Sequence, residues 1–316
     1  MTPLDSLREA SIVRLEPSGK LGRLVEVLRA NALPPDVPLA TQRARFETVT
    51  ARMPLAEGVA CSAVDAGGVA AEWVEPPAVG VAAPVVVYFH GGGYGMGSLN
   101  TIRALASQLA SATSARLLSV DYRLAPEHPF PAAVDDAVAA YAWLLDQGTD
   151  PAAVAFGGDS AGGGLTVAGL LAARDRGLPM PAAGVCISPW VDLTVSSPAL
   201  ERNAATDPEV TRAALERWAE NYLAGGDPKN PLASPVYGDL RGLPPLLIHA
   251  GTAEALEDDA VQLAATAQDA GVPVTLELYE GLIHVWHAFA PRLPEATAAI
   301  ERIAAWLGER WAGGSA

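Results

Sequence analysis

The sequence predicts an α/β protein in which helices cover both faces of a mostly parallel sheet and a further helical segment forms a cap. Short apolar runs that mostly lack polar alternation indicate strands that are buried on both faces. Segments with helical periodicity separate these runs, and such β-α-β alternation is typical of a parallel sheet. The chain has 316 residues, a length compatible with one large core and a modest insertion.

This alternation extends through most of the chain. The apolar runs predict strands at Val85–Phe89, Ala115–Val120, Ala153–Phe156, Ala183–Ile187, Leu246–Ile248 and Val274–Tyr279. Helical spacing predicts helices at Leu99–Thr113, Pro131–Asp146, Ala161–Arg174, Leu256–Ala270 and Glu295–Trp311. Upstream of these elements, we interpret Arg45–Ala51 and Val69–Glu75 as edge strands, which completes an eight-stranded sheet.

Two segments do not fit the alternation. Leu4–Asn31 is amphipathic and helical, and Asp192–Gly226 interrupts the sheet with a further helix at Pro208–Leu223. Both would emerge near the carboxyl ends of strands, where α/β sites open, so we interpret them as one cap rather than as independent decorations. The predicted division is 1–45 for the first part of the cap, 46–190 for the first part of the core, 191–228 for the cap insertion and 229–316 for the second part of the core.

Composition excludes several classes of function. With 21 basic and 36 acidic residues, the formal net charge of −15 repels phosphate backbones and argues against a nucleic-acid partner. No apolar stretch approaches the roughly 20 residues of a membrane helix, and the start of the chain lacks a signal-peptide pattern. We therefore expect a cytoplasmic protein without a membrane partner. Cys61 and Cys186 show no metal or redox spacing, and we expect neither a metal nor an organic cofactor.

Ser160 is the candidate nucleophile. It lies in Gly158-x-Ser160-x-Gly162, between a predicted strand and a predicted helix. Glycines at both flanking positions permit a bend tight enough to lift the serine Oγ out of the backbone. The spacing therefore predicts nucleophilic catalysis at Ser160.

A second glycine-rich segment follows the predicted strand Val85–Phe89. It reads His90-Gly91-Gly92-Gly93-Tyr94-Gly95, and consecutive glycines expose backbone N–H groups that suit an oxyanion. A phosphate cradle is the alternative, but the lysine of a P-loop and the acidic partner of a dinucleotide fingerprint are both missing. The oxyanion interpretation is therefore preferred.

Acyl transfer by serine also needs a base and an acid. On this kind of sheet the acid follows the serine in the chain, and the histidine base follows the acid. Among the three histidines after Ser160, His249 lies inside a strand run and His287 is interpreted as support for the next helix, which favours His284. The acid is expected after the preceding strand, where spacing alone leaves four carboxylates open: Glu254, Glu257, Asp258 and Asp259. Those not used would be acids at a helix N-terminus, where the helix dipole favours them.

Four motifs together resemble one known family. They are His90-Gly91-Gly92-Gly93, Asp121-Tyr122-Arg123-Leu124-Ala125-Pro126-Glu127, Gly158-Asp159-Ser160-Ala161-Gly162-Gly163 and Gly281-Leu282-Ile283-His284. Their order and approximate spacing resemble those of the hormone-sensitive lipase family of carboxylesterases, which has the α/β-hydrolase fold. The resemblance extends from about residue 45 to residue 310.

The resemblance implies roles for particular residues. It implies Ser160 as nucleophile, His284 as base, and an oxyanion hole formed by the N–H groups of Gly92, Gly93 and Ala161. It also implies Glu254 as the acid, at a position where many members have aspartate in an Asp-Pro-Leu-x-Asp motif. This chain has Glu254-Ala255-Leu256-Glu257-Asp258 there, which leaves Asp258 as the alternative. The segment 122–127 is expected to brace the core, with Arg123 and Glu127 as an internal ion pair.

The expected activity is therefore hydrolysis of short- to medium-chain acyl esters through a Ser-His-Glu triad and an acyl-enzyme. The alternatives are an amidase or deacetylase that uses the same residues, and a non-catalytic ligand-binding member of the fold. Tyr94 and Trp190 are candidate walls of the substrate pocket or, alternatively, ordinary core aromatics. By analogy with the family, Val274–Leu278 and the last helix could mediate a homodimer.

Overall fold

The apolar runs of the chain assemble into one sheet in the computed structural model, which describes residues 2–33 and 37–313. The nine strands of this described part lie in the order β1-β9-β8-β7-β6-β4-β5-β3-β2, and the pairs from β1 to β5 are parallel. Their bounds are β1 Ile12–Val13, β2 Ala60–Asp65, β3 Ala70–Glu75, β4 Val85–Phe89, β5 Arg116–Val120, β6 Val154–Asp159, β7 Ala183–Ile187, β8 Leu246–Gly251 and β9 Val274–Tyr279. The mostly parallel α/β architecture is confirmed.

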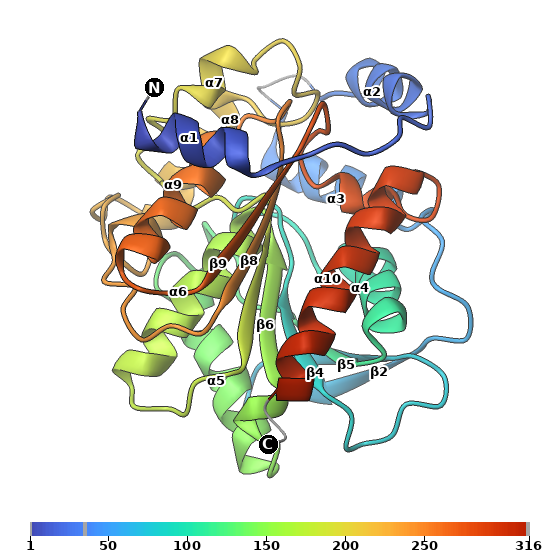
Figure 1. The fold of residues 1–316 in the computed structure, drawn as a ribbon, viewed down its shortest axis with the longest axis vertical. Coiled ribbons are helices and arrows are strands. Elements are labelled where there is room, and N and C mark those ends of the chain that lie inside the picture. Colours follow the sequence, from blue (N-terminus) through green and yellow to red (C-terminus); the bar gives the residue numbers. More distant parts are fainter. Residues whose placement is uncertain (1, 34–36, 314–316) are drawn as a thin grey trace.

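Helices connect and cover these strands (Figure 1). Those of the core are α4 Leu99–Thr113, α5 Ala132–Asp146, α6 Ala161–Asp175, α9 Glu257–Asp269 and α10 Pro294–Gly313. The remaining α-helices are α1 Pro3–Ala10, α2 Leu21–Ala30, α3 Leu39–Thr50, α7 Ala199–Arg202 and α8 Arg212–Leu223. Three short 3₁₀ turns are η1 Pro151–Ala153, η2 Pro235–Tyr237 and η3 Trp286–Phe289.

The sheet separates two apolar cores because successive strand residues point to opposite faces. On β4, Val85, Val87 and Phe89 belong to the core beneath α5, α6 and α9, whereas Val86 and Tyr88 belong to the core beneath α4 and α10. All five are buried, which explains why the strand shows no polar alternation in the sequence.

One of the two predicted edge strands is a helix in the structure. The segment predicted as an edge strand at Arg45–Ala51 is the end of helix α3, and the hydroxyls of Thr48 and Thr50 donate to the carbonyls of Ala44 and Phe46 four residues earlier. Its β-branched residues suggest a strand locally, but packing of α3 against α4 outweighs that weak preference. The prediction at Val69–Glu75 is confirmed as β3.

Two strands of the described sheet, β1 and β2, were not predicted and carry little sequence signal. β2 is almost entirely exposed, so it has no apolar run, and β1 is only two residues long. β1 pairs with Leu278 and Tyr279, so this end of β9 is covered by another strand of the same chain. The proposed homodimer through β9 and α10 stays a prediction.

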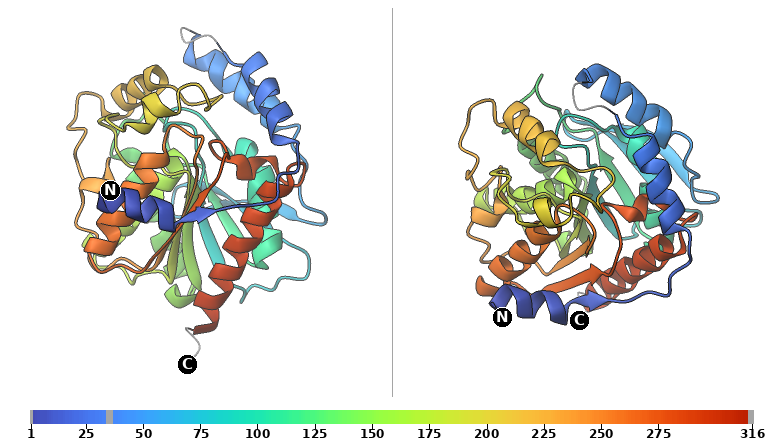
Figure 2. Two further views of the ribbon diagram at one scale, coloured as in Figure 1. Left: turned by 45° about the horizontal axis from the view of Figure 1, so that its top comes forward. Right: turned by 90° about the horizontal axis from the view of Figure 1, so that it is seen from above.

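The helices outside the core gather near one end of the sheet (Figure 2). α7 and α8 come from the insertion, and α2 and α3 from the N-terminal segment. α1 packs on α9 at the side of the core. The boundaries predicted for the cap, whose first range includes residues 1 and 34–36 outside the described part, stay a prediction. Among the described residues, no helix combines the length and apolarity that a membrane crossing requires.

Candidate active site

Four loops carry the predicted site residues, and each follows the carboxyl end of a parallel strand. The glycine loop follows β4, Ser160 follows β6, Glu254 follows β8 and His284 follows β9. β4 and β6 are direct neighbours, with Phe89 paired to Gly158, and β8 and β9 pair as far as their last residues. Parallel strands end at the same edge of a sheet, so the topology brings the four loops to one edge.

Ser160 lies in a sharp turn between β6 and α6. Its backbone has φ 55° and ψ −121°, a conformation that is strained for any residue other than glycine. The Ser160 N–H donates to the carbonyl of Ile187 on β7 at 2.8 Å, which helps to hold the turn. A Cβ at Gly158 would collide with the backbone of Gly162, and one at Gly162 would collide with the carbonyl of Phe89. The two glycines of the motif are therefore sterically required.

The glycine loop presents unpaired backbone donors beside this serine. Gly92 and Gly93 have φ values of 120° and 61°, which glycine adopts readily. In the described part of the chain, no acceptor pairs with the N–H groups of Gly92, Gly93 or Ala161. Ala161 is the first residue of α6, where the positive end of the helix dipole favours an anion. These three amides have the chemistry of an oxyanion hole.

A tryptophan of the cap covers this loop. The indole ring of Trp218 on α8 lies so close to Gly93 that a Cβ at that position would overlap it. Gly93 is therefore glycine both for its positive φ and for the close approach of this ring. Trp218 was not among the residues that the sequence singled out, because helical spacing alone does not show which residue of α8 contacts the glycine loop.

Glu254 and His284 meet in the interior. Glu254 is fully buried, and its Oε1 lies 3.7 Å from Nδ1 of His284. Its other oxygen, Oε2, accepts hydrogen bonds from the hydroxyl of Ser188 at 2.8 Å and from the N–H of Gly251 at 3.0 Å. The carboxylate is thus fixed while one oxygen faces the imidazole, as the acid of a triad requires.

Ser188 links the acid to the loop of the histidine. Its Oγ donates to Glu254 and accepts from the N–H of Val285, the residue after His284, at 3.1 Å. Sequence reasoning missed Ser188. The signal available was its place directly after β7, because the other site residues also follow strand ends.

Asp258, the alternative acid, serves a different purpose. It accepts from the N–H of Ala199 at 2.7 Å and forms ion pairs with Arg8 and Arg202. These partners lie on α7 and α1, so Asp258 ties those two helices to the start of α9. The geometry favours Glu254 as the partner of His284.

The other two candidate histidines lie in a separate buried network. Nδ1 of His249 lies 3.2 Å from Nε2 of His287, and Nε2 of His249 lies 3.0 Å from Glu277. Both histidines are fully buried, and burial lowers the pKa of each. The position of His249 on β8 is confirmed, and His287 is the second residue of the short η3 turn after the loop.

The segment after β5 braces the glycine loop, but one predicted ion pair is wrong. The hydroxyl of Tyr122 donates to the carbonyl of His90 at 2.7 Å. Arg123 forms its ion pair with Asp136 on α5, and Glu127 forms its own with Arg43 on α3. The side chains of Arg123 and Glu127 thus reach different helices, which spacing along a loop does not reveal.

Tyr94 and Trp190 lie inside the protein, and each is 1% exposed. The ring of Tyr94 stacks on that of Tyr222 from α8, with 3.8 Å between centroids, and lies 6.1 Å from the ring of Trp190. Both residues therefore pack in the core below the cap, and their contact with substrate stays a prediction.

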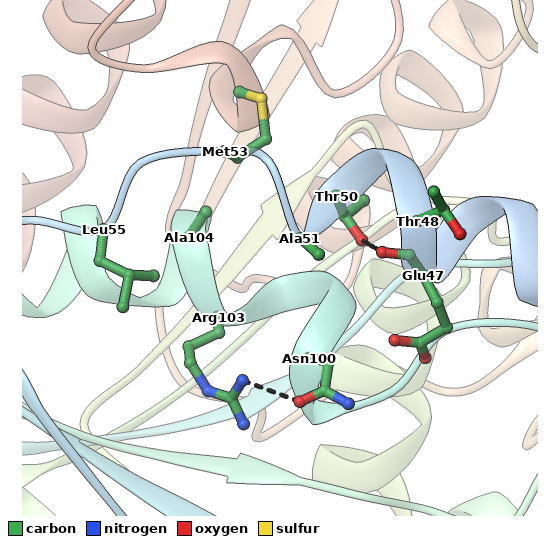
Figure 3. Close-up of a pocket in the computed structure, with 9 residues that line it drawn as sticks. All are labelled: Glu47, Thr48, Thr50, Ala51, Met53, Leu55, Asn100, Arg103 and Ala104. Carbon is green, nitrogen blue, oxygen red and sulfur yellow. Dashed lines mark hydrogen bonds between the residues drawn. The ribbon is translucent and has the colours of Figure 1, made fainter.

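A cavity of about 430 Å³ lies between α3 and the start of α4 (Figure 3). Its lining includes Glu47, Thr50, Asn100 and Arg103. None of the predicted catalytic residues lines this cavity, so its position does not identify the substrate site.

Three carboxylates raise the pKa of the His284 imidazole. Burial alone would lower the pKa of His284, but Glu254, with further contributions from Asp207 and Glu209 of the cap segment, raises this pKa to about 9. The carboxylates favour the imidazolium because they stabilise its positive charge. A base must be neutral to accept a proton. We therefore expect kcat/KM to rise with pH as His284 loses its proton, which gives the pH profile a rising limb.

The variant Glu209→Gln tests this origin of the limb. Removing one carboxylate lowers the pKa of His284, so the limb should move to lower pH. Glu220→Gln on α8 is the matched control, because it removes an exposed carboxylate that does not contribute to the pKa of His284. The measurement is kcat/KM from about pH 5 to 10 for the three proteins. A limb that stays in place in Glu209→Gln would contradict the assignment.

Together, the sheet topology, the serine turn and the buried carboxylate–imidazole pair define an α/β-hydrolase. The family model described as the alpha/beta hydrolase fold matches residues 86–288. An acetyl-hydrolase of Streptomyces hygroscopicus is 50% identical over 244 residues, covering 77% of this chain and 81% of its own. The carboxylesterase NlhH of Mycobacterium tuberculosis is 36% identical over 236 residues, covering 72% and 74%.

Solved structures agree with these relatives. An esterase of the bacterial hormone-sensitive lipase family has 45% identity and a TM-score of 0.90, covering 94% of this chain and 100% of its own. An esterase/lipase from an uncultured bacterium has 47% identity and a TM-score of 0.89, covering 93% and 99%. The chain belongs to the bacterial hormone-sensitive lipase family of the α/β-hydrolase fold, and it is a carboxylic ester hydrolase.

Proposed function

We propose that this enzyme hydrolyses short- to medium-chain acyl esters through Ser160, His284 and Glu254 with a covalent acyl-enzyme. The observation that carries the proposal is the strained turn at Ser160 beside three unpaired backbone amides. Strain of this kind persists only where the surrounding structure enforces it, and here it exposes a nucleophile. The buried Glu254–His284 pair supplies the matching base and acid.

The proposed reaction has two halves. In the first, His284 accepts the hydroxyl proton as Ser160 Oγ bonds to the ester carbonyl carbon, and the amides of Gly92, Gly93 and Ala161 stabilise the resulting oxyanion. The bond from carbon to the alcohol oxygen then breaks, and His284 protonates the departing alcohol. In the second half, water attacks the acyl-enzyme with His284 as base, which releases the acid and restores Ser160. Glu254 stabilises the imidazolium in both halves.

Two relatives support the proposed acyl length. One similar structure, with 47% identity, is of an esterase whose crystals were soaked with p-nitrophenyl butyrate. The Streptomyces relative is named an acetyl-hydrolase. In this chain Trp218 lies against Gly93 and limits the space beside the proposed oxyanion hole. We therefore propose acetyl to roughly hexanoyl esters as the preferred substrates.

The test is hydrolysis of p-nitrophenyl esters from acetate to palmitate by the wild type and by Trp218→Ala. We expect the wild type to peak at short chains, and the variant to gain kcat/KM on octanoate relative to acetate because the indole no longer fills that space. Leu4→Ala is a control substitution of an apolar residue on α1, away from the glycine loop. A wild-type peak at palmitate would contradict the proposed acyl range.

Removal of an N-acetyl group is the second candidate, favoured by the name acetyl-hydrolase, which does not restrict the reaction to esters. The same residues would act, with an amine as the leaving group. Comparing p-nitrophenyl acetate with p-nitroacetanilide separates the two activities. We expect the ester to be preferred, and faster turnover of the anilide would favour the amide candidate.

A further inference from the structure

Helix α3 holds the loop that supplies the oxyanion donors. Arg43 on this helix donates from Nε to the carbonyl of Gly95 at 2.8 Å and from a terminal nitrogen to the carbonyl of Ala125 at 2.9 Å. The same guanidinium forms two hydrogen bonds of 2.7 Å with the carboxylate of Glu127. One side chain thus joins a helix of the N-terminal segment to two core loops.

One turn further along α3, Glu47 makes a second contact with the same region. Its Oε1 accepts a hydrogen bond from the hydroxyl of Ser98, and Ser98 also caps the start of α4. Figure 3 shows Glu47 on α3 facing the first turn of α4 across the cavity. Arg43 and Glu47 therefore hold both ends of the segment 95–98, which is separated from the oxyanion glycines only by Tyr94.

A chain of hydrogen bonds connects Arg43 to the amide of Gly93. The carbonyl of Gly95 and the N–H of Met96 belong to one peptide unit, and this N–H donates to the carbonyl of Gly92 at 2.9 Å. The carbonyl of Gly92 and the N–H of Gly93 belong to the next unit in the chain of bonds. Each bond orients and polarises the following peptide, so the cation of Arg43 and the N–H of Gly93 lie at opposite ends of one aligned series.

Glu127 keeps the guanidinium in this orientation. The hydrogen bonds from Arg43 lower the pKa of Glu127 to about 2, so this carboxylate stays charged over the whole working range. The planar fork of arginine can bind a carboxylate with two donors while Nε reaches a carbonyl, which the single ammonium of lysine cannot do.

We propose that Arg43 is a positioning residue of the oxyanion hole, which orients and polarises the Gly93 N–H through the peptides 95–96 and 92–93. The proposal rests on the proposed function, because it assigns the Gly93 amide to the oxyanion. It predicts that Arg43 acts on the transition state, in which the oxyanion is charged, and has little effect on binding of the neutral ester.

The test compares Arg43→Ala, Arg43→Lys and the control Arg45→Ala. Arg45 lies on the same helix, and within the described residues its side chain donates hydrogen bonds only to Asn31, the residue that caps the end of α2. Steady-state kinetics on p-nitrophenyl butyrate separates kcat from KM. The inhibition constant of an alkyl trifluoromethyl ketone, whose adduct with Ser160 carries an oxyanion, reports the oxyanion hole directly. Thermal unfolding shows whether each variant is folded.

For Arg43→Ala we expect kcat to fall by about 10- to 100-fold, the effect of a slightly misplaced group, with KM within about twofold of the wild type. Inhibition by the ketone should weaken by the same factor. Arg43→Lys should recover part of the loss, because it keeps the charge without the fork, and Arg45→Ala should resemble the wild type.

An unchanged kcat and ketone affinity in folded Arg43→Ala, or a loss confined to KM, would overturn the proposal. If Arg43→Ala does not fold, Arg43→Lys decides by the same two measurements: equal losses in kcat and ketone affinity support the proposal, and unchanged values overturn it. Activity of Ser160→Ala distinguishes the two levels, because retained turnover there would refute the proposed function itself, whatever Arg43 does.

Discussion

Replacing Ser160 by alanine lowers kcat on p-nitrophenyl butyrate by on the order of 10⁶-fold, the expected cost of removing the nucleophile from a unit that acts together. Alanine keeps the Cβ and removes only the oxygen, so the turn between β6 and α6 should persist. Labelling by a fluorophosphonate, which bonds to an activated serine, should disappear with the activity. This loss of kcat is the largest effect that we expect from any single substitution. Steady-state kinetics and labelling both measure it.

The matched control is Ser111→Ala, which removes the hydroxyl of an exposed serine on α4. We expect its kcat and its labelling to equal those of the wild type. A further variant, Ser160→Gly, should be inactive but more stable than Ser160→Ala by about 1 kcal/mol, because glycine adopts φ 55° without strain. Retained turnover in folded Ser160→Ala would show that another residue attacks the ester.

The second largest effect is expected at Glu254. Glu254→Gln should lower kcat by on the order of 10⁴-fold, because an amide no longer holds His284 in the required tautomer or stabilises the imidazolium. The loss should appear in kcat on every acyl length, since the group acts on the base and not on the substrate. Steady-state kinetics on the acetate and butyrate esters measures it.

Asp258→Asn is the informative control for the acid. Its contacts with Ala199, Arg8 and Arg202 hold α7 and α1 to the start of α9, so its loss should lower the temperature of unfolding while kcat stays close to that of the wild type. If Asp258→Asn lost activity as Glu254→Gln is expected to do, and Glu254→Gln did not, the acid would have to be reassigned.

Local sequence patterns predict much of the architecture. The buried strands β4, β6, β7 and β8 are mostly apolar runs because both faces of each are covered by helices. The spacing of the glycines also predicts the turn at Ser160, since only glycine fits at positions 158 and 162, where a Cβ would overlap the backbone. Exposed or very short elements carry no such pattern, which is why β2 and β1 escaped prediction and α3 was mistaken for a strand.

The fold class, the family resemblance and the candidate nucleophile, base and oxyanion glycines can be predicted from the amino-acid sequence, because each depends on motifs or apolar runs whose own residues lie close together in the chain. The folded structure was needed to show which carboxylate faces His284, that Ser188 links the acid to the histidine loop, and that Glu127 pairs with Arg43 rather than Arg123. Such partners lie tens of residues apart in the sequence. Their contact depends on the packing of whole helices against the sheet, which no local pattern of residues specifies.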